Sequence, residues 1–164
     1  MDASSERGPG PGENRTTVER KSERELLTMR TFNGPARIVY EAWTKPELLK
    51  RWWAPKSTGM EIVSCEMDVR VGGGYRLEIR HPSAPAPMPF FGKYLEVTPN
   101  ARLVWTNDES ASGPITTVTF EEIAGKTRVV LHDLFPSKEA FEESRGAEDG
   151  LPEQFDQLDE LLAT

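Results

Sequence analysis

The sequence holds few side chains that could act as a metal ligand or as a nucleophile. His81 and His132 lie far apart along the chain, and neither stands in a His/Cys/Asp/Glu spacing typical of metal sites. Cys65 is the single cysteine, and its neighbours form no reactive motif, so we expect a buried structural thiol. The glycines at 72–74 lack the Lys-Ser/Thr pair of a phosphate-binding loop and precede a strand, which indicates a turn. We therefore predict no metal site and no cofactor.

The candidates for a pocket-facing general acid or base are Glu78, Tyr94 and His132. Strand residues alternate between two faces, and in each of the three strands this alternation places the candidate opposite its apolar neighbours. The sequence also contains no nucleophile elbow and no Ser-His-Asp order. We therefore predict no catalytic residue, although an enzyme remains an alternative.

Large aromatic side chains are the residues best suited to build a binding site. Together with two leucines they could converge on one interior, as a packed core or as the lining of an apolar pocket. Trp52 and Trp53 are adjacent and cannot both point inward equally, so we expect one of them at the pocket mouth. The predicted ligand-binding residues are Trp43, Trp52, Trp53, Tyr75, Leu77, Phe91, Trp105, Phe120, Phe155 and Leu158.

Two short helices are expected around three of the four tryptophans. Pro35 and Pro46 each suit the first turn of a helix, where the missing N–H of proline costs nothing. Helices this short are unstable alone in water, so they need a sheet to pack against. Their apolar faces are formed by Val39, Ala42 and Trp43 in the first and by Leu48, Leu49, Trp52 and Trp53 in the second.

From Met60 onward the hydrophobic period changes to two, which predicts six strands joined by short turns. Another strand is expected at 25–31, before the helices. Short connections between neighbouring strands indicate an antiparallel meander. In the third of the six strands, the residues expected on one face are Phe91, Lys93, Leu95 and Val97.

The last predicted element is an amphipathic helix. Its apolar face is formed by Leu151, Phe155, Leu158, Leu161 and Leu162. Its polar face is formed by Asp156, Gln157, Asp159 and Glu160. The expected architecture is α+β: a curved, seven-stranded antiparallel sheet wrapped around the C-terminal helix, with a cavity between them.

Several segments resemble the helix-grip fold of the START and birch-pollen-allergen superfamily (SRPBCC), over roughly residues 25–163. The likeness is greatest to the branch named after the activator of the 90-kDa heat-shock chaperone's ATPase. The final helix of that branch usually opens with Gly-Trp, whereas this chain has Gly150-Leu151. The segments that carry the resemblance are Pro35–Thr44, Pro46–Pro55, Asp68–Gly73, Gly92–Val97 and Arg102–Thr106.

Composition limits the domain organisation and the partners. Residues 1–24 hold few apolar side chains, so we expect a disordered extension followed by one domain at 25–164. Residues 133–164 carry ten acidic and two basic side chains within a chain of net charge −7, which argues against nucleic acid as a partner. No apolar run is long enough for a membrane span and the first residues form no secretory signal, so we expect a cytoplasmic protein.

Three functions follow from the resemblance. The first is intracellular binding of a small hydrophobic or amphipathic ligand by a monomer or weak homodimer. The second is activation of the chaperone's ATPase, which makes a chaperone a possible partner. The third is an enzyme, a cyclase or hydrolase of the same superfamily.

Overall fold

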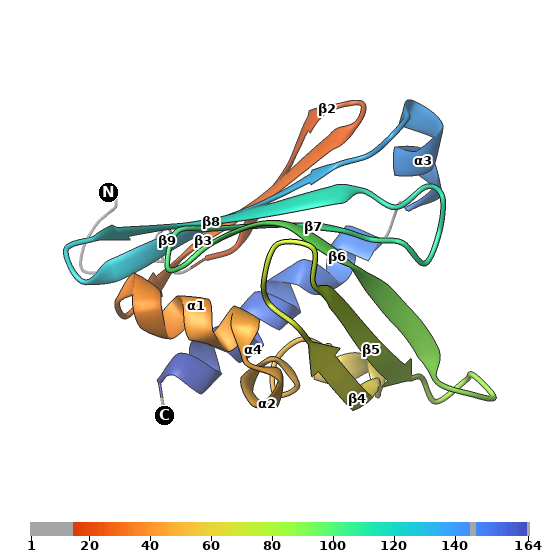
Figure 1. The fold of residues 1–164 in the computed structure, drawn as a ribbon, viewed down its shortest axis with the longest axis horizontal. Helices are drawn as coiled ribbons and strands as arrows, with labels where there is room; N and C mark the ends of the chain where they lie inside the picture. Colours follow the sequence, from red (N-terminus) through yellow and green to blue (C-terminus); the bar gives the residue numbers. More distant parts are fainter. Residues whose placement is uncertain (1–14, 145–146, 164) are drawn as a thin grey trace.

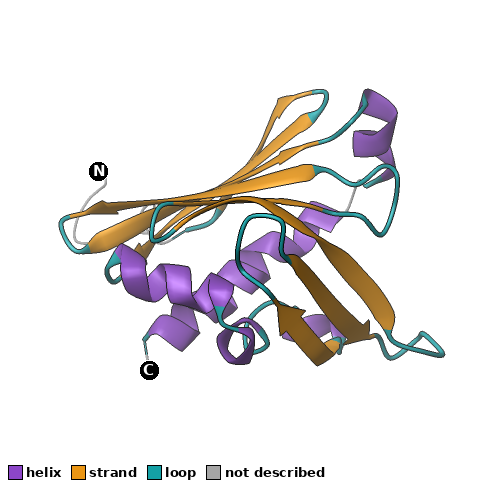
Figure 2. Cartoon of the chain, viewed as in Figure 1, coloured by secondary structure: helices purple, strands orange, loops and turns teal. Residues whose placement is uncertain are grey.

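The computed structural model describes residues 15–144 and 147–163, which form an eight-stranded antiparallel sheet with helices on one face (Figures 1 and 2). The strands are β2 (Thr17–Ser22), β3 (Glu25–Asn33), β4 (Glu61–Met67), β5 (Gly74–Arg80), β6 (Met88–Thr98), β7 (Arg102–Thr106), β8 (Ile115–Ile123) and β9 (Lys126–Leu134). The helices are α1 (Ala36–Thr44), α2 (Pro46–Leu49), α3 (Lys138–Glu143) and α4 (Leu151–Leu162), with 3-10 turns at Lys56–Thr58 and Ala147–Gly150.

The sheet is the predicted meander. Its order is β2-β3-β9-β8-β7-β6-β5-β4, so strands β4 to β9 each pair with the next one along the chain. The strand before the helices, β3, pairs with β9 in unbroken register from Glu25 opposite Leu134 to Asn33 opposite Lys126. Figure 1 shows the sheet bending so that β4 and β5 reach down on the side of the helices, where β4 contacts α2. The predicted α+β class and antiparallel topology are confirmed.

The strand count differs from the prediction of seven, because Thr17–Ser22 forms the additional edge strand β2. This segment lies inside the region expected to be disordered, and that expectation is wrong for residues 17–22. All six of its residues are exposed, so β2 buries no apolar face and is held by main-chain pairing with β3. Low hydrophobicity excludes a core element but does not exclude an edge strand. Residues 1–14 lie outside the described part of the chain.

Helices α1 and α4 cover one face of the sheet, and their apolar side chains form the core (Figure 1). Phe155 and Leu158 of α4 are fully buried, as the helical spacing predicts. The Phe155 ring meets that of Phe32 on β3 edge-on, with centroids 5.6 Å apart. The start of α1 is held by the Glu122 carboxylate of β8, which accepts a hydrogen bond from the Ala36 N–H at 2.9 Å.

One residue expected on the polar face of α4 is buried. The Gln157 side-chain amide donates to the carbonyls of Trp52 (2.8 Å) and Ala54 (2.9 Å) and accepts from the Lys56 N–H (2.8 Å). The chain after α2 is irregular there, and its backbone groups need polar partners. Gln157 supplies them, which is why a polar residue lies on a buried face.

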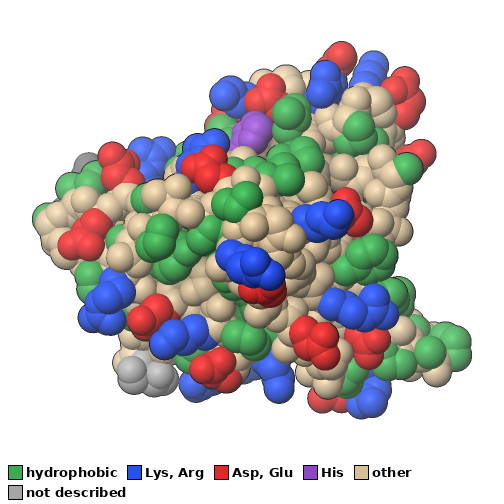
Figure 3. Space-filling model, in the orientation of Figure 1, with side chains coloured by type: hydrophobic (Ala, Val, Ile, Leu, Met, Phe, Trp, Pro, Cys, Tyr) green, Lys and Arg blue, Asp and Glu red, His purple; other side chains and the backbone are tan. Residues whose placement is uncertain are grey.

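Two observations bear on membranes and on nucleic acid. None of their helices is long and apolar enough to cross a membrane. On the side of the molecule seen in Figure 3, Lys and Arg side chains are interspersed with Asp and Glu. Exclusion of nucleic acid as a partner stays a prediction.

Candidate functional site

Tryptophans from three elements meet beneath the sheet. Trp43, at the end of α1, has its ring centroid 4.8 Å from that of Trp52, 5.9 Å from Trp53 and 6.1 Å from Trp105. Trp52 is fully buried, and its indole N–H donates to the Ala42 carbonyl at 2.9 Å. Trp53 is only partly buried. The adjacent pair therefore divides as predicted, with Trp52 in the core and Trp53 at a cavity wall.

Helix α4 fixes the backbone that carries Trp53. Gln157 bonds the carbonyls on either side of Trp53, and the Gln154 amide donates to the Trp53 carbonyl itself. Glu153 accepts hydrogen bonds from the N–H and the hydroxyl of Ser57. Because these bonds hold the main chain, the Trp53 ring is positioned by a rigid helix rather than by loop packing alone.

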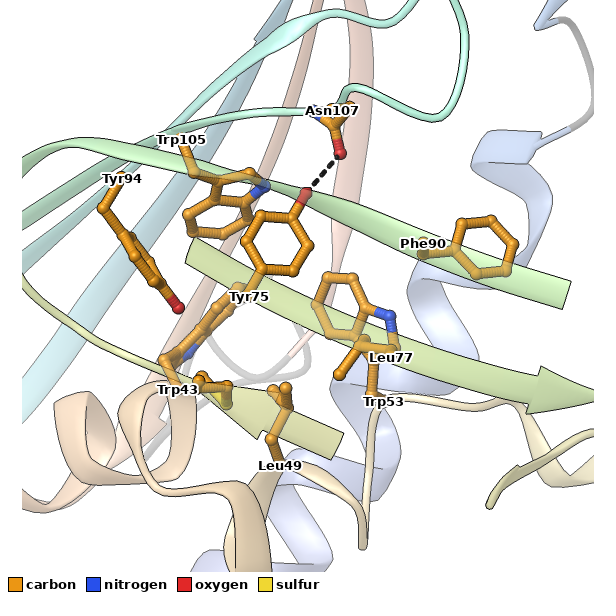
Figure 4. A pocket seen from close by; sticks show the side chains of 10 residues that line it. Trp43, Leu49, Trp53, Tyr75, Leu77, Phe90, Tyr94, Trp105 and Asn107 are labelled. Atoms are coloured by element: carbon orange, nitrogen blue, oxygen red, sulfur yellow. Dashed lines mark hydrogen bonds between the residues drawn. The ribbon is translucent and has the colours of Figure 1, made fainter. Parts of the chain in front are cut away.

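A cavity of about 80 Å³ lies among these rings, and we call it the aromatic cavity (Figure 4). Figure 4 shows Tyr75, Trp105 and Trp53 arranged around it. The Trp43 indole N–H is buried and has no acceptor among the described residues. The lining residues are Trp43, Leu49, Trp53, Met67, Tyr75, Leu77, Phe90, Tyr94, Trp105 and Asn107.

A second cavity, of about 220 Å³, adjoins the first, and we call it the Asp133 cavity. The two cavities share Trp53, Trp105 and Asn107 as walls. Its remaining walls come from β3, β8, β9 and the segment around α4, and they include the Asp133 carboxylate. The site is therefore apolar at one end and carries a carboxylate at the other.

A chain of hydrogen bonds links the two cavities. The Tyr75 hydroxyl donates to the Thr106 carbonyl at 2.7 Å and lies 3.3 Å from Asn107 Oδ1 (Figure 4). The Asn107 amide donates to Thr116 Oγ1 at 2.9 Å, and the Thr116 hydroxyl donates to Asp133 Oδ1 at 2.6 Å. Because Thr116 accepts from one neighbour and donates to the other, the chain has a direction that ends at the carboxylate.

Burial raises the pKa of Asp133 from 3.8 to about 6, partly offset by the hydrogen bond from Thr116 and by the nearby His132. A carboxyl group that is largely shielded by protein loses part of the hydration that favours its charged form. Such perturbed groups inside a cavity are frequent at functional sites. Asp133 is thus a chemically unusual group of the described chain, and it lines a cavity.

Five of the ten predicted ligand-binding residues line the aromatic cavity, and five do not. Trp52, Phe120, Phe155 and Leu158 belong to the packed core, where Phe120 contacts Trp43 edge-on at 6.1 Å. The five residues that line the cavity are Trp43, Trp53, Tyr75, Leu77 and Trp105. Whether any of them contacts a ligand stays a prediction.

The tenth residue, Phe91, lies on the outer face of the sheet, contrary to the prediction. Its ring contacts the Arg76 guanidinium at 5.7 Å, and Leu95 on the same face is half exposed. The inward residues at this end of β6 are instead Phe90 and Tyr94. A register shift between Tyr94 and Glu96 changes the alternation, so a pattern read across β6 as one regular strand assigns its first half to the wrong face.

The three acid–base candidates lie in different places in the structure. Tyr94 was expected to face away from the interior, but it is buried and lines the aromatic cavity, where burial raises its pKa. His132 lies 3.0 Å from the Glu25 carboxylate, outside both cavities. Glu78 bonds Arg76 on the exposed side of β5. Tyr94 therefore joins the site residues, as a hydroxyl that favours its neutral form.

Asp133 and Asn107 are the polar residues that the sequence reasoning missed. Asp133 continues the inward parity of Val129 and Leu131 by one further step along β9, and that signal was available in the sequence. Asn107 lies just beyond β7, and its role depends on the loop that brings Pro114 and Thr116 beside it. No periodicity predicts such a contact. Within 15–144 and 147–163, no three His, Cys, Asp or Glu residues are grouped so that they could hold a metal ion.

The sequence from 33 to 163 matches the family described as Activator of Hsp90 ATPase homolog 1-like protein. The chain belongs to this family. The match spans the tryptophan segment, the meander and α4, and thus both cavities except the wall at Leu26. A comparison with functionally curated proteins finds no significant match.

Several solved structures have the same fold as this member of the Activator of Hsp90 ATPase homolog 1-like family. A protein of Nitrosomonas europaea is 27% identical, with a TM-score of 0.78 over 88% of this chain and 97% of its own. A protein of Rhodobacter sphaeroides is 20% identical, with a TM-score of 0.81 over 90% and 97%. A relative from Aeromonas hydrophila, itself named for this family, is 20% identical, with a TM-score of 0.70 over 85% and 94%.

Proposed function

We propose that this domain binds a small amphipathic molecule whose apolar part lies against Trp43, Trp53 and Trp105. The observation that carries the proposal is the pair of adjoining cavities with shared tryptophan walls. Ligand sites are typically concave, mostly apolar and furnished with a few fixed polar groups. The aromatic cavity has this character, and the hydrogen-bonded chain from Tyr75 to Asp133 provides the fixed polar groups.

The cavity volumes limit the size of the ligand. Sites for drug-sized molecules are usually about 300–1,000 Å³. The cavities of about 80 and 220 Å³ are each smaller than that. We therefore expect a ligand with a single ring or a short chain, rather than a two-chain lipid.

The test is a thermal-shift and calorimetric screen of small aromatic and short-chain compounds, together with native mass spectrometry of the purified protein. Leu77→Phe adds bulk at a wall of the aromatic cavity and should weaken binding. Leu95→Phe makes the same change on the exposed outer face and should not. The proposal is contradicted if no compound binds, or if both variants bind as the wild type does.

Activation of the chaperone ATPase is a second candidate, favoured by the family match alone. Its test is the ATPase rate of the host's 90-kDa chaperone with and without this protein. A rate increase that Leu77→Phe leaves unchanged would support an activator role that does not need the cavity. An unchanged rate would contradict activation and leave ligand binding unaffected.

A further inference from the structure

The Asp133 cavity contains a carboxylate, and a purely apolar ligand would make no favourable interaction with this group. Among the described residues, its lining includes the Asp133 carboxylate but no Lys, Arg or His. Oδ1 of Asp133 accepts the hydrogen bond from Thr116, whereas Oδ2 has no hydrogen-bond partner among the described residues. Asp133 is only partly exposed, so a cation or a strong hydrogen-bond donor that reaches Oδ2 would stabilise its charged form.

Within the described part of the chain, the basic side chains near this carboxylate are bound to other groups. His132, its neighbour in β9, is bound to Glu25, and the Arg24 guanidinium donates to the Phe135 carbonyl at 2.9 Å. Asp108 and Glu109 follow Asn107 in the loop after β7, and they add negative rather than positive charge near Tyr75. Among the described residues, no Lys, Arg or His therefore forms an ion pair with Asp133, although His132 acts on it from a distance.

From this geometry we propose that Asp133 binds the protonated amine of an amphipathic ligand, with the Trp53 and Trp105 rings alongside its apolar part. This inference rests on the proposed ligand-binding function and names its ligand class, a small organic cation. An ammonium group can donate a hydrogen bond to Oδ2 and leave the bond from Thr116 in place. Tryptophan rings also attract cations, so the shared walls suit the same ligand.

The experiment compares three probes of similar shape: phenethylammonium, 2-phenylethanol and 3-phenylpropanoate. Dissociation constants are measured by tryptophan fluorescence or NMR titration of the full chain near neutral pH. Because a hydrogen bond to a charged group is worth about 1.5–3 kcal/mol, phenethylammonium should bind at least about tenfold more tightly than the alcohol. The anionic probe should bind most weakly.

Asp133→Asn keeps the size of the side chain and an acceptor for Thr116 but removes the charge. It should abolish the preference for the ammonium while changing the affinity for the alcohol no more than about threefold. His132→Gln, at the neighbouring residue bound to Glu25, is the matched control and should keep the preference. Ammonium affinity should fall as the pH is lowered through about 6 in the wild type, and it should still fall at low pH in His132→Gln, which retains Asp133.

The outcomes separate this inference from the function on which it rests. Equal binding of ammonium and alcohol, or a preference that survives Asp133→Asn, overturns the cation site and leaves ligand binding in place. Failure of all three probes, together with an empty screen of other small compounds, overturns both.

Discussion

The Asp133 carboxyl group should destabilise the folded protein at neutral pH. Its pKa is about 6 in the folded state, against 3.8 for the ordinary group. Because folding raises this pKa, the folded state favours the neutral carboxyl group. The contribution of Asp133 to the free energy of unfolding is therefore complete below about pH 4 and is lost as the pH rises through 6. At about 1.4 kcal/mol per pKa unit, the ionised group costs up to ~3 kcal/mol at neutral pH.

Asp133→Asn removes this pH dependence, so its stability advantage over the wild type should grow with pH. Between about pH 4.5 and pH 7.5 the linkage relation gives a growth of about 2 kcal/mol in the free energy of unfolding. For a domain of this size that corresponds to roughly 4–8 °C in Tm. Urea unfolding of both proteins at the two pH values measures the difference directly.

The matched control is Asp68→Asn, which removes one negative charge from an exposed side chain. It makes the same change in net charge as Asp133→Asn. The difference between its free energy of unfolding and that of the wild type should not grow with pH in the same way. If Asp133→Asn shows no growth, or loses stability as the pH rises, the carboxylate is not desolvated and the electrostatic account of the cavity is wrong.

Two further predictions concern groups around the site. Gln157→Ala removes three hydrogen bonds and leaves backbone groups of Trp52, Ala54 and Lys56 without partners. The free energy of unfolding, measured in urea, should therefore fall by about 2–4 kcal/mol. A fall below about 0.5 kcal/mol would contradict the role given to Gln157. Burial raises the pKa of the Cys65 thiol to about 11, so alkylation by iodoacetamide at pH 8 should be much slower than for an exposed thiol, and equal rates would contradict it.

The sheet was predictable from sequence because its central strands each bury one face. The period-two pattern therefore indicates which strands exist, and the short connections between them indicate the order in which they pair. The edge strand β2 escapes this reasoning, since main-chain pairing with β3 requires no apolar residue. The burial of Gln157 was not predictable for a related reason. Its partners are backbone groups of a loop, and a hydropathy pattern carries no information about backbone groups.

The site was predictable only in part. The convergence of Trp43, Trp53 and Trp105 follows from their places on α1, the segment after α2, and β7. Phe91 was assigned to the wrong face because a register shift in β6 has no signature that hydropathy alone reveals. The division between rings that fill the core and rings that border a cavity depends on packing among distant elements.

Binding at the shared tryptophan walls is tested most directly by the indole N–H signals of the four tryptophans during a titration with a small aromatic amine. The signals of Trp53 and Trp105 should shift most and saturate together, because both rings border both cavities. Trp52 is the internal control: its indole is buried and bonded to Ala42, so its signal should shift least. No saturable shift at Trp53 and Trp105, or an equal shift of all four signals, would contradict the account.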